Sequence, residues 1–467
     1  MYENAINLIN TYLYSYILIA MLIILGIYFT VKTRFVQFRL FGHMFKLLTE
    51  KAQLEDGKEG ISSFQAFCIS AASRIGTGNI AGVAVAISTG GPGAVFWMWI
   101  IALIGAGSSF VESTLGQIYK VKDGDAFRGG PAYYIEQALG NRKLGLFFSI
   151  LTTVTFGFIF NMVQVNTIAS AFDEAFGIQA SVTGIILLIL TTLVIFGGVK
   201  KIAQVTSILV PVMATIYVAV ALFIMLKNFA LIPVMFKLIF TNAFGFKQLA
   251  GGTFGAVIMN GIKRGLYSNE AGMGSVPNAA AAATTSHPVK QGLIQTLGVF
   301  TDTILVCSAT AFIILISGVM ETTTGLQGIQ LTQAAVSSQV GSWGNSFIAI
   351  CIFLFAFSSV IGNYYYGETN LQFMNLGASS LLFYRVMALA MVMIGAIAKF
   401  GLVWDTADVF MGAMTLINLV VITMLAPIAV GCLKDYEKQL KQGKNPIFES
   451  KLVPAIGKVE CWESKGK

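Results

Sequence analysis

The chain has 467 residues, of which 56% are hydrophobic and 11% are charged, and its mean hydropathy is +0.76. A soluble protein of this length cannot bury so much apolar surface, so the composition excludes a soluble domain and indicates an integral membrane protein. The formal net charge of +8 is attributed to loops beside anionic lipid, and no nucleic-acid partner is expected.

The first apolar stretch, at about 14–31, is expected to be a retained transmembrane helix. No basic region precedes it, as a cleavable signal peptide would require, and Lys32, Arg34 and Arg39 follow it. The five cysteines are scattered without a Cys-x-x-Cys pair, so the sequence predicts neither a disulfide framework nor a metal site built from cysteines.

Because each crossing needs about 20 apolar residues, the sequence predicts an all-α membrane protein with about eleven transmembrane helices. The loops on one side would hold 23 Lys and Arg, the opposite loops 4, and the interrupted spans the remaining three. This bias predicts a cytoplasmic C-terminus and an N-terminus outside, in the cell membrane. The expected spans are 14–31, 61–89, 93–119, 145–172, 181–199, 204–226, 250–283, 291–317, 345–369, 380–398 and 408–432.

The second span is interrupted at 75–80 by the sequence Ile-Gly-Thr-Gly-Asn-Ile. Glycine weakens a helix, and backbone groups freed within a membrane must face a cavity, an ion or a solute. Secondary transporters use such breaks to coordinate a coupling cation and to hold an anionic substrate group. The alternative is that these are the packing glycines common in membrane helices.

A second interrupted span is predicted at 250–283, where the glycine-rich stretch 251–261 leads into Ser-Asn-Glu-Ala-Gly-Met-Gly-Ser at 268–275. It would open a second unit of five spans, as the first interrupted span opens the first unit. Five is odd, so the second unit must be inverted, which gives a 5+5 inverted repeat with one extra N-terminal helix. The expected units are the extra helix and a cytoplasmic loop (1–60), the first repeat (61–227), an extracellular connection (228–249), the inverted repeat (250–432) and a cytoplasmic polar tail (433–467).

Four stretches, at 74–83, 90–99, 268–275 and 362–368, resemble the alanine or glycine:cation symporter family, and the similarity extends over about residues 10–435. The resemblance implies a leucine-transporter-type fold and sodium-driven uptake of small neutral amino acids. It implies a transporter rather than an enzyme, with sodium as the coupling ion and no other cofactor. The Gly-x-Gly-Asn element also resembles the first broken helix of the neurotransmitter:sodium symporters.

Ser358 and Ser359 are adjacent hydroxyls in the ninth predicted span. Small hydroxyls in membrane helices often serve only for packing or bond to their own helix. Two together, in the span that the fold sets against the first broken helix, favour a sodium site. The resemblance adds the backbone carbonyls of Ala72, Ile75 and Phe355 as further ligands, and Asn79 is a candidate for an additional sodium site.

The substrate zwitterion needs a partner for each charged end. Its carboxylate suits the backbone N–H groups of the first break, and its ammonium suits carbonyls released at the second break, expected near Met259 and Asn260. On the fourth span Gln164 is expected to contact substrate, whereas Asn161 and Asn166 have interhelical hydrogen bonding as an equal alternative. The predicted substrate-binding residues are Gly76, Thr77, Gly78, Asn79, Gln164, Phe254, Met259, Asn260 and Asn363.

Ionisable residues at membrane depth are expected to be paired or functional, and Arg74 is expected to pair with one of the acids. Many members of the family carry tryptophan where this chain has Asn363, so a larger or more polar neutral substrate, such as glutamine or serine, becomes credible. The ionisable residues at membrane depth are Arg74, Glu112, Lys263, Arg264, Glu270, Asp302 and Glu368.

The function expected from these features is sodium-coupled symport of small neutral amino acids, such as alanine, glycine, serine or glutamine, by alternating access. A proton-coupled or sodium-independent amino-acid permease on the same fold is the closest alternative. An intramembrane enzyme would need paired aspartates, a Ser–His couple or metal ligands within the spans, and a channel would not need two discontinuous helices.

Overall fold

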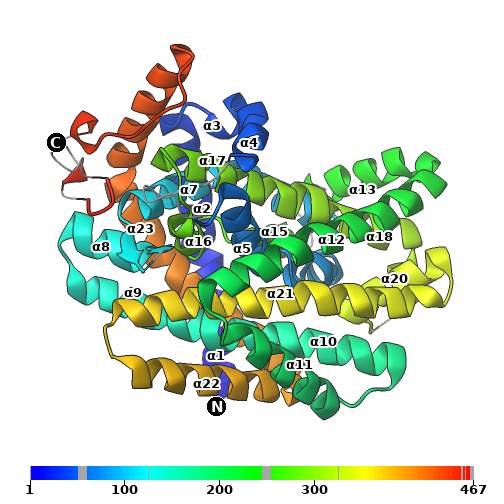
Figure 1. Ribbon diagram of the computed structural model, residues 1–467. Coiled ribbons are helices and arrows are strands. Elements are labelled where there is room, and N and C mark those ends of the chain that lie inside the picture. Colours follow the sequence, from blue (N-terminus) through cyan, green and yellow to red (C-terminus); the bar gives the residue numbers. More distant parts are fainter. Residues whose placement is uncertain are drawn as a thin grey trace.

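The computed structural model describes residues 2–50, 60–124, 126–244, 254–323, 325–453, 456–457 and 459–462. This part of the chain is helical apart from its loops and a single two-stranded antiparallel sheet, in which Val121 pairs with Arg128 (Figure 1). The elements up to residue 176 are α1 (Tyr2–Tyr12), η1 (Leu13–Leu18), α2 (Ile19–Lys32), α3 (Val36–Arg39), α4 (Phe41–Leu48), α5 (Ser63–Arg74), η2 (Gly78–Gly82), α6 (Val83–Gly90), α7 (Ala94–Ile118), β1 (Val121–Asp123), β2 (Ala126–Arg128), α8 (Pro131–Leu139), α9 (Arg142–Val154), η3 (Thr155–Phe160) and α10 (Asn161–Phe176).

The second half of the chain continues in the same helical manner, and its longest helices are α21 and α23. The elements are α11 (Ala180–Ile195), α12 (Gly198–Lys227), η4 (Phe229–Leu231), α13 (Ile232–Phe244), α15 (Phe254–Asn269), α16 (Val276–Ala282), α17 (Pro288–Val299), η5 (Phe300–Cys307), α18 (Ser308–Ser317), α19 (Val319–Thr322), α20 (Ile329–Val340), α21 (Trp343–Phe373), α22 (Ala378–Ile397), α23 (Phe400–Lys441) and η6 (Ser450–Leu452).

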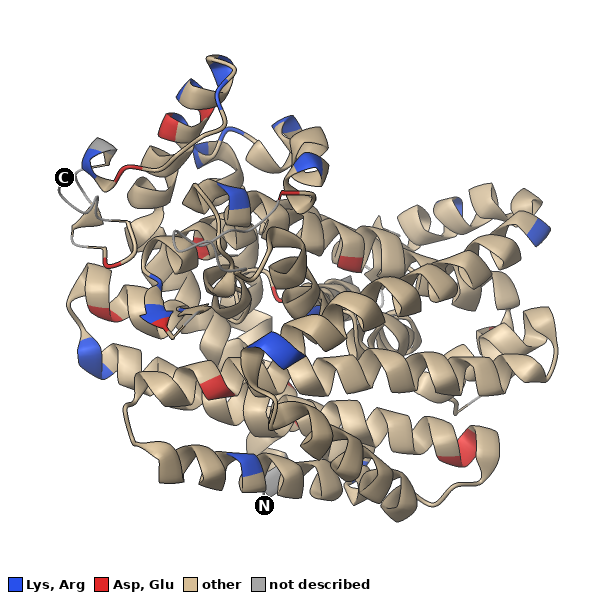
Figure 2. Ribbon diagram, in the orientation of Figure 1, with Lys and Arg blue, Asp and Glu red and all other residues tan. Residues whose placement is uncertain are grey.

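Within the described ranges, eight helical stretches are long and apolar enough to cross a membrane, in agreement with a multi-pass membrane protein. Large apolar side chains such as Leu193, Leu226 and Phe383 are exposed on α11, α12 and α22, as lipid-facing residues would be. Charged residues are sparse along the helical bodies and gather at the end formed by α3, α4 and the last turns of α23 (Figure 2). The count of eleven spans, the inverted repeat and the orientation of the termini stay predictions.

Local sequence and backbone geometry explain where α5, the first half of the first interrupted helix, begins and ends. Helix α5 begins at a capping box in which Ser62 and Gln65 satisfy each other's backbone N–H groups. It ends at Ile75, whose φ of −80° and ψ of 82° leave helical geometry directly before Gly76. The chain then resumes as the π-helical turn η2 and α6, so the predicted break at 75–80 is confirmed.

The second interrupted helix breaks between α15 and α16, at residues 270–275. The backbone there takes positive φ at Glu270, Gly272 and Gly274, a conformation that suits glycine. The expectation that carbonyls are released near Met259 and Asn260 is wrong, because both residues lie inside α15, which runs unbroken to Asn269.

π-helical turns recur in the middle of the long spans, and two of them, η2 and η5, meet at the first break. The turn η2 contacts η5 and α15, and η3 packs against α21. Such turns are frequent at functional sites in membrane helices because they shift the helical register and free backbone groups. The centre of the molecule is therefore irregular on several helices at once.

Described residues after α23 fold back onto the helical bundle. The Phe448 N–H donates to the Ser286 carbonyl at 2.9 Å, and the Trp462 indole donates to the Gln117 carbonyl at 3.0 Å. The prediction of a polar tail starting at 433 is thus modified: α23 continues to Lys441, and the following described residues pack against the ends of α7 and α17. Residues 245–253 and 463–467, which belong to the predicted connection, second repeat and tail, lie outside the described residues.

Candidate transport site

The first break presents two backbone N–H groups that side-chain amides occupy. Gly76 donates its N–H to Asn79 Oδ1 at 2.9 Å, and Thr77 donates its N–H to Gln164 Oε1 at 3.1 Å. All four residues are buried. The Gly76 N–H also lies 3.0 Å from the Arg74 carbonyl. Both N–H groups are therefore held by neutral oxygen acceptors, and their binding of a carboxylate stays a prediction.

Both glycines of the break stand where the backbone approaches a neighbouring helix. A Cβ built at Gly76 would lie 2.2 Å from Ser359 Oγ, and one built at Gly78 would lie 3.0 Å from Ser268 Cα. The close approach of α21 thus requires glycine at position 76. Glycine at position 78 lets the first break pack against the last turn of α15.

The residues predicted to bind sodium come together beside this break. Ser359 Oγ donates to the Ala72 carbonyl at 2.8 Å, and Ser358 Oγ donates to the Phe355 carbonyl at 2.8 Å. Ser359 Oγ also lies 3.1 Å from the Phe355 carbonyl, and Ile75 is buried one turn after Ala72. The structure therefore gathers hard oxygen atoms from α5 and α21, whereas their role in binding sodium stays a prediction.

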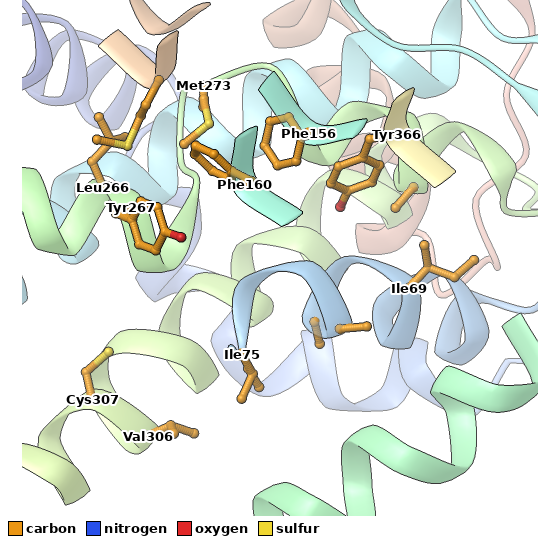
Figure 3. Close-up of a cluster of buried hydrophobic side chains, with 14 of the residues drawn as sticks. Ile69, Ile75, Phe156, Phe160, Leu266, Tyr267, Met273, Val306, Cys307 and Tyr366 are labelled. Atoms are coloured by element: carbon orange, nitrogen blue, oxygen red, sulfur yellow. The ribbon is translucent and has the colours of Figure 1, made fainter. Parts of the chain in front are cut away.

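Aromatic side chains from three helices cover the first break on the side of α15. The ring of Tyr267 lies near that of Phe160 (Figure 3), with 5.0 Å between the two centroids. The centroid of the Trp404 ring lies 4.9 Å from that of Tyr267. The Tyr267 hydroxyl lies 3.4 Å from Thr77 Oγ1. Nothing in the sequence marks Tyr267 or Trp404, because their approach depends on the packing of α15 and α23 against η3.

The other residues predicted to contact substrate differ in where they lie relative to the first break. Asn363 Oδ1 lies 2.8 Å from Ser73 Oγ, on the turn of α5 that precedes the break, and its contact with substrate stays a prediction. Asn166 donates to the carbonyls of Gly395 and Ala398, so the interhelical alternative is confirmed for this residue. Phe254 begins α15, and its side chain lies outside the described part of the chain.

A buried ion-pair network lies on α15 three to four residues before the aromatic cover. Asp408 on α23 binds the Lys263 ammonium at 2.6 Å and the Arg264 guanidinium at 2.5 Å. The Arg264 guanidinium stacks over the Trp404 ring at 4.9 Å from its centroid. The Tyr14 hydroxyl donates to the Asp408 carbonyl at 2.9 Å, so the N-terminal helix is tied to the same network.

The second break is held by a carboxylate. Glu112 on α7 accepts the N–H groups of Gly272 and Gly274, each at 3.0 Å, and the Asn418 amide at 2.8 Å. These bonds satisfy the backbone groups that the break would otherwise leave unpaired within the membrane. Glu112 was expected to be paired or functional, and its observed role is to fix the backbone of the second break.

Among the described residues, Arg74 forms no ion pair with an acid, so the prediction of such a pair is wrong. Its guanidinium donates to the Gln295 carbonyl at 3.0 Å and to Ser109 Oγ at 3.3 Å, and its Nε has no hydrogen-bond partner among the residues that the structure describes. Arg74 thus contributes a buried positive charge near the carboxylates without direct contact with any of them.

Two interrupted helices that meet beside buried oxygen atoms, within a bundle of apolar spans, are typical of membrane transporters of small solutes. The model of the sodium:alanine symporter family matches residues 1–450, and the chain belongs to this family. It is therefore a membrane protein of a cation-coupled amino-acid symporter family and not an enzyme.

Two relatives from Bacillus subtilis illustrate the similarity. The chain is 53% identical to the amino-acid carrier protein AlsT over 99% of its own length and 98% of that protein. It is also 53% identical to the probable sodium/glutamine symporter GlnT, over 98% and 96% of the two lengths. A crystal structure of a mutant manganese transporter from Eremococcus coleocola superposes with a TM-score of 0.52 at 15% identity, over 85% and 86% of the chains, which shows a shared fold.

Proposed function

We propose that this protein takes up small neutral amino acids together with sodium by alternating access, with eleven spans arranged as two inverted five-helix repeats after an extra N-terminal helix. The observation that carries the proposal is the meeting of the Ala72 and Phe355 carbonyls with the Ser359 hydroxyl, directly beside the first break. Sodium prefers such hard oxygen ligands. Since the ligands belong to α5 and α21, a bound ion would draw these two helices together.

The substrate carboxylate would bind the N–H groups of Gly76 and Thr77. An anionic carboxylate is a stronger acceptor than an amide oxygen, so it can displace the side-chain oxygens of Asn79 and Gln164 that hold these donors. The buried surroundings strengthen this interaction, because little water competes for the N–H groups. Alanine, glycine, serine and glutamine are the proposed substrates, and one relative, the probable sodium/glutamine symporter GlnT, is named for glutamine.

Ion replacement in proteoliposomes tests the proposal. Uptake of labelled alanine and glutamine is measured with an inward gradient of sodium, of potassium or of protons, at a clamped membrane potential. Sodium alone is expected to drive accumulation. Equal accumulation with potassium, or with a proton gradient and no sodium, would replace the proposal by a sodium-independent or proton-coupled permease.

A matched pair of serine variants tests the position of the ion. Ser359→Ala removes a hydroxyl that touches α5, and it is expected to raise the sodium concentration for half-maximal uptake about fivefold to tenfold, because the lost ligand costs on the order of 1 kcal/mol. Ser207→Ala removes an exposed hydroxyl that bonds only to its own helix, at the Gln204 carbonyl, and it is the control. Equal sodium dependence in the two variants would show that Ser359 is no ligand.

A further inference from the structure

A small cavity lies between the hairpin of β1 and β2, the first turn of α12 and the second half of α21. Its volume is about 210 Å³, below the range of about 300–1,000 Å³ that is common for sites of drug-sized ligands. On the hairpin, the side chains of Asp123 and Arg128 are 39% and 24% exposed, whereas Glu368 and Tyr365 line the cavity from α21 and are buried. The cavity therefore opens toward water at the hairpin, within the loop 120–144 that is predicted to be cytoplasmic.

Two loose ion pairs bring charges of both signs to this cavity. Arg128 Nη1 lies 3.6 Å from Asp123 Oδ1, and Glu368 Oε1 lies 3.6 Å from Arg385 Nη2. Both distances exceed that of a hydrogen bond. Among the described residues, Arg128 Nε and Glu368 Oε2 are buried without a hydrogen-bond partner. A buried polar atom without a partner is unfavourable, so each of these two atoms favours a ligand that supplies one.

The balance of charge around the cavity selects the class of ligand. The charges of the two acids and the two arginines cancel, so a ligand with a net charge of either sign would be repelled by one member of each pair. A zwitterion satisfies both signs, because its ammonium donates to Glu368 and its carboxylate accepts from Arg128. Phe127 and Val199 add apolar surface for a small side chain.

A file of aromatic rings connects the first break with this cavity. Successive ring centroids are 5.0, 4.7 and 5.3 Å apart along Tyr267, Phe160, Phe156 and Tyr366 (Figure 3). The ring of Tyr365, which lines the cavity, follows at 6.1 Å from that of Tyr366, and its hydroxyl donates to the Asn278 carbonyl on α16 at 3.3 Å. Side chains rotate without breaking the helices that carry them, so this file can open while the spans stay intact.

We propose that this cavity is a release site, in which the transported zwitterion binds after it leaves the first break, with its ammonium at Glu368 and its carboxylate at Arg128. The inference rests on the proposed function and deepens it by adding a second substrate site on the way to the cytoplasm. Both charged ends of the substrate find partners there before they are fully hydrated. The cavity shares no residue with the proposed sodium site at Ser359, so its binding of substrate should not depend on sodium.

Binding measured in potassium separates this cavity from the first break, whose affinity depends on sodium in the proposed function. Saturation-transfer NMR follows the binding of alanine to the detergent-solubilised full chain, beside alaninamide, which lacks the carboxylate, and propionate, which lacks the ammonium. Wild type is expected to bind alanine about tenfold more tightly than either analogue, because each analogue loses one charge-assisted hydrogen bond. No binding of alanine, or equal binding of alanine and either analogue, would overturn the inference.

Two variants at the cavity should each remove one part of this selectivity. Arg128→Gln is expected to bind alanine no more tightly than alaninamide, and Glu368→Gln is expected to bind it no more tightly than propionate. These are changes in selectivity, which a loss of folding would not produce. Arg142→Gln and Glu136→Gln are the matched controls, because they neutralise an ion pair of 2.6 Å outside the cavity, and they should keep the wild-type selectivity. Wild-type selectivity in Arg128→Gln or Glu368→Gln would overturn the assignment of that end of the ligand.

Val199→Trp fills the cavity without changing a charge, and it tests the place of the cavity in transport. In proteoliposomes it should lower the maximal rate of sodium-driven uptake several-fold, while the sodium concentration for half-maximal uptake stays as in wild type because the first break is unchanged. Leu193→Trp adds the same ring at an exposed position of α11 and is the control, with a rate like that of wild type. Equal rates in the two variants, both eluting as single folded species, would show that substrate leaves by another route.

The outcomes also separate this inference from the proposed function. If uptake needs no sodium, yet Arg128→Gln loses the preference for alanine over alaninamide, sodium symport fails and the cavity site stands. If sodium drives uptake and this preference persists in Arg128→Gln, symport stands and the release site is overturned.

Discussion

Replacing Gly76 by alanine should disable both halves of the transport site, because this glycine lies between them. The added Cβ would stand 2.2 Å from Ser359 Oγ and 2.9 Å from Gln164 Oε1. Ordinary van der Waals contact begins at 3.4 Å, so the serine oxygen would have to move by about 1.2 Å. Such a shift breaks its 2.8 Å bond to the Ala72 carbonyl.

The size of the effect follows from these contacts. Losing a buried hydrogen bond costs about 1 kcal/mol, and overpacking by one methyl group costs roughly 1–3 kcal/mol. The sum is about 2–4 kcal/mol, which corresponds to a loss of affinity of roughly 30-fold to several hundredfold where it acts on binding. Gly76→Leu adds three more carbon atoms and should abolish substrate binding altogether.

Gly82→Ala is the matched control within the same interrupted span. A Cβ there meets nothing closer than 3.6 Å, so the variant is expected to bind substrate and sodium as wild type does. The assay is the rise in melting temperature of purified protein on adding alanine or glutamine in sodium and in potassium. If Gly76→Ala retains the full sodium-dependent rise, the carboxylate and sodium do not meet at this break.

Further variants probe the remaining residues. Changing Ser358 and Ser359 together to alanine should raise the sodium concentration for half-maximal uptake well over tenfold, because two ligands are lost at about 1 kcal/mol or more each; wild-type sodium dependence would place the ion elsewhere. Gln164→Glu should weaken substrate binding more than tenfold in equilibrium binding, because a carboxylate would compete for the Thr77 N–H and repel the substrate; unchanged affinity would separate Gln164 from the substrate. Asn363→Trp should shift competition for labelled uptake toward alanine and glycine, since overfilling a cavity costs roughly 1–3 kcal/mol; an identical ranking would show that Asn363 does not set the pocket volume. Glu112→Gln should lower the melting temperature, because an ionised acceptor of two backbone N–H groups is lost; an unchanged melting temperature would contradict its role at the second break.

The two interrupted helices show what sequence can reveal about such a fold. The first break was predictable because glycines stand together in an otherwise apolar span, and the structure ends α5 at that point. The second break was predicted too early in the sequence, because glycine can serve either close packing or a positive φ. Gly261 permits close packing, since a Cβ there would lie 2.4 Å from the Ala94 carbonyl, whereas Gly272 and Gly274 supply the positive φ of the actual break.

Long-range pairing was the part that the sequence left open. Asp408 lies 144 residues from Arg264, and only the packing of α23 against α15 brings the two charges together. Arg74 looked like the partner of an acid because it is charged at membrane depth, yet carbonyl and hydroxyl oxygens take its hydrogen bonds. Composition indicates that such charges must be satisfied, whereas the identity of the satisfying group depends on the tertiary fold.

The two breaks differ in the acceptors that hold their N–H groups, and this difference supports the proposal that the first binds a ligand while the second holds the fold. At the first break the N–H groups are held by the neutral amide oxygens of Asn79 and Gln164, and at the second by the carboxylate of Glu112. Hydrogen bonds to a charged acceptor contribute about 1.5–3 kcal/mol, and those to a neutral acceptor about 0.5–1.5 kcal/mol. A substrate carboxylate can therefore displace an amide from Gly76, but it gains nothing by displacing another carboxylate from Gly272.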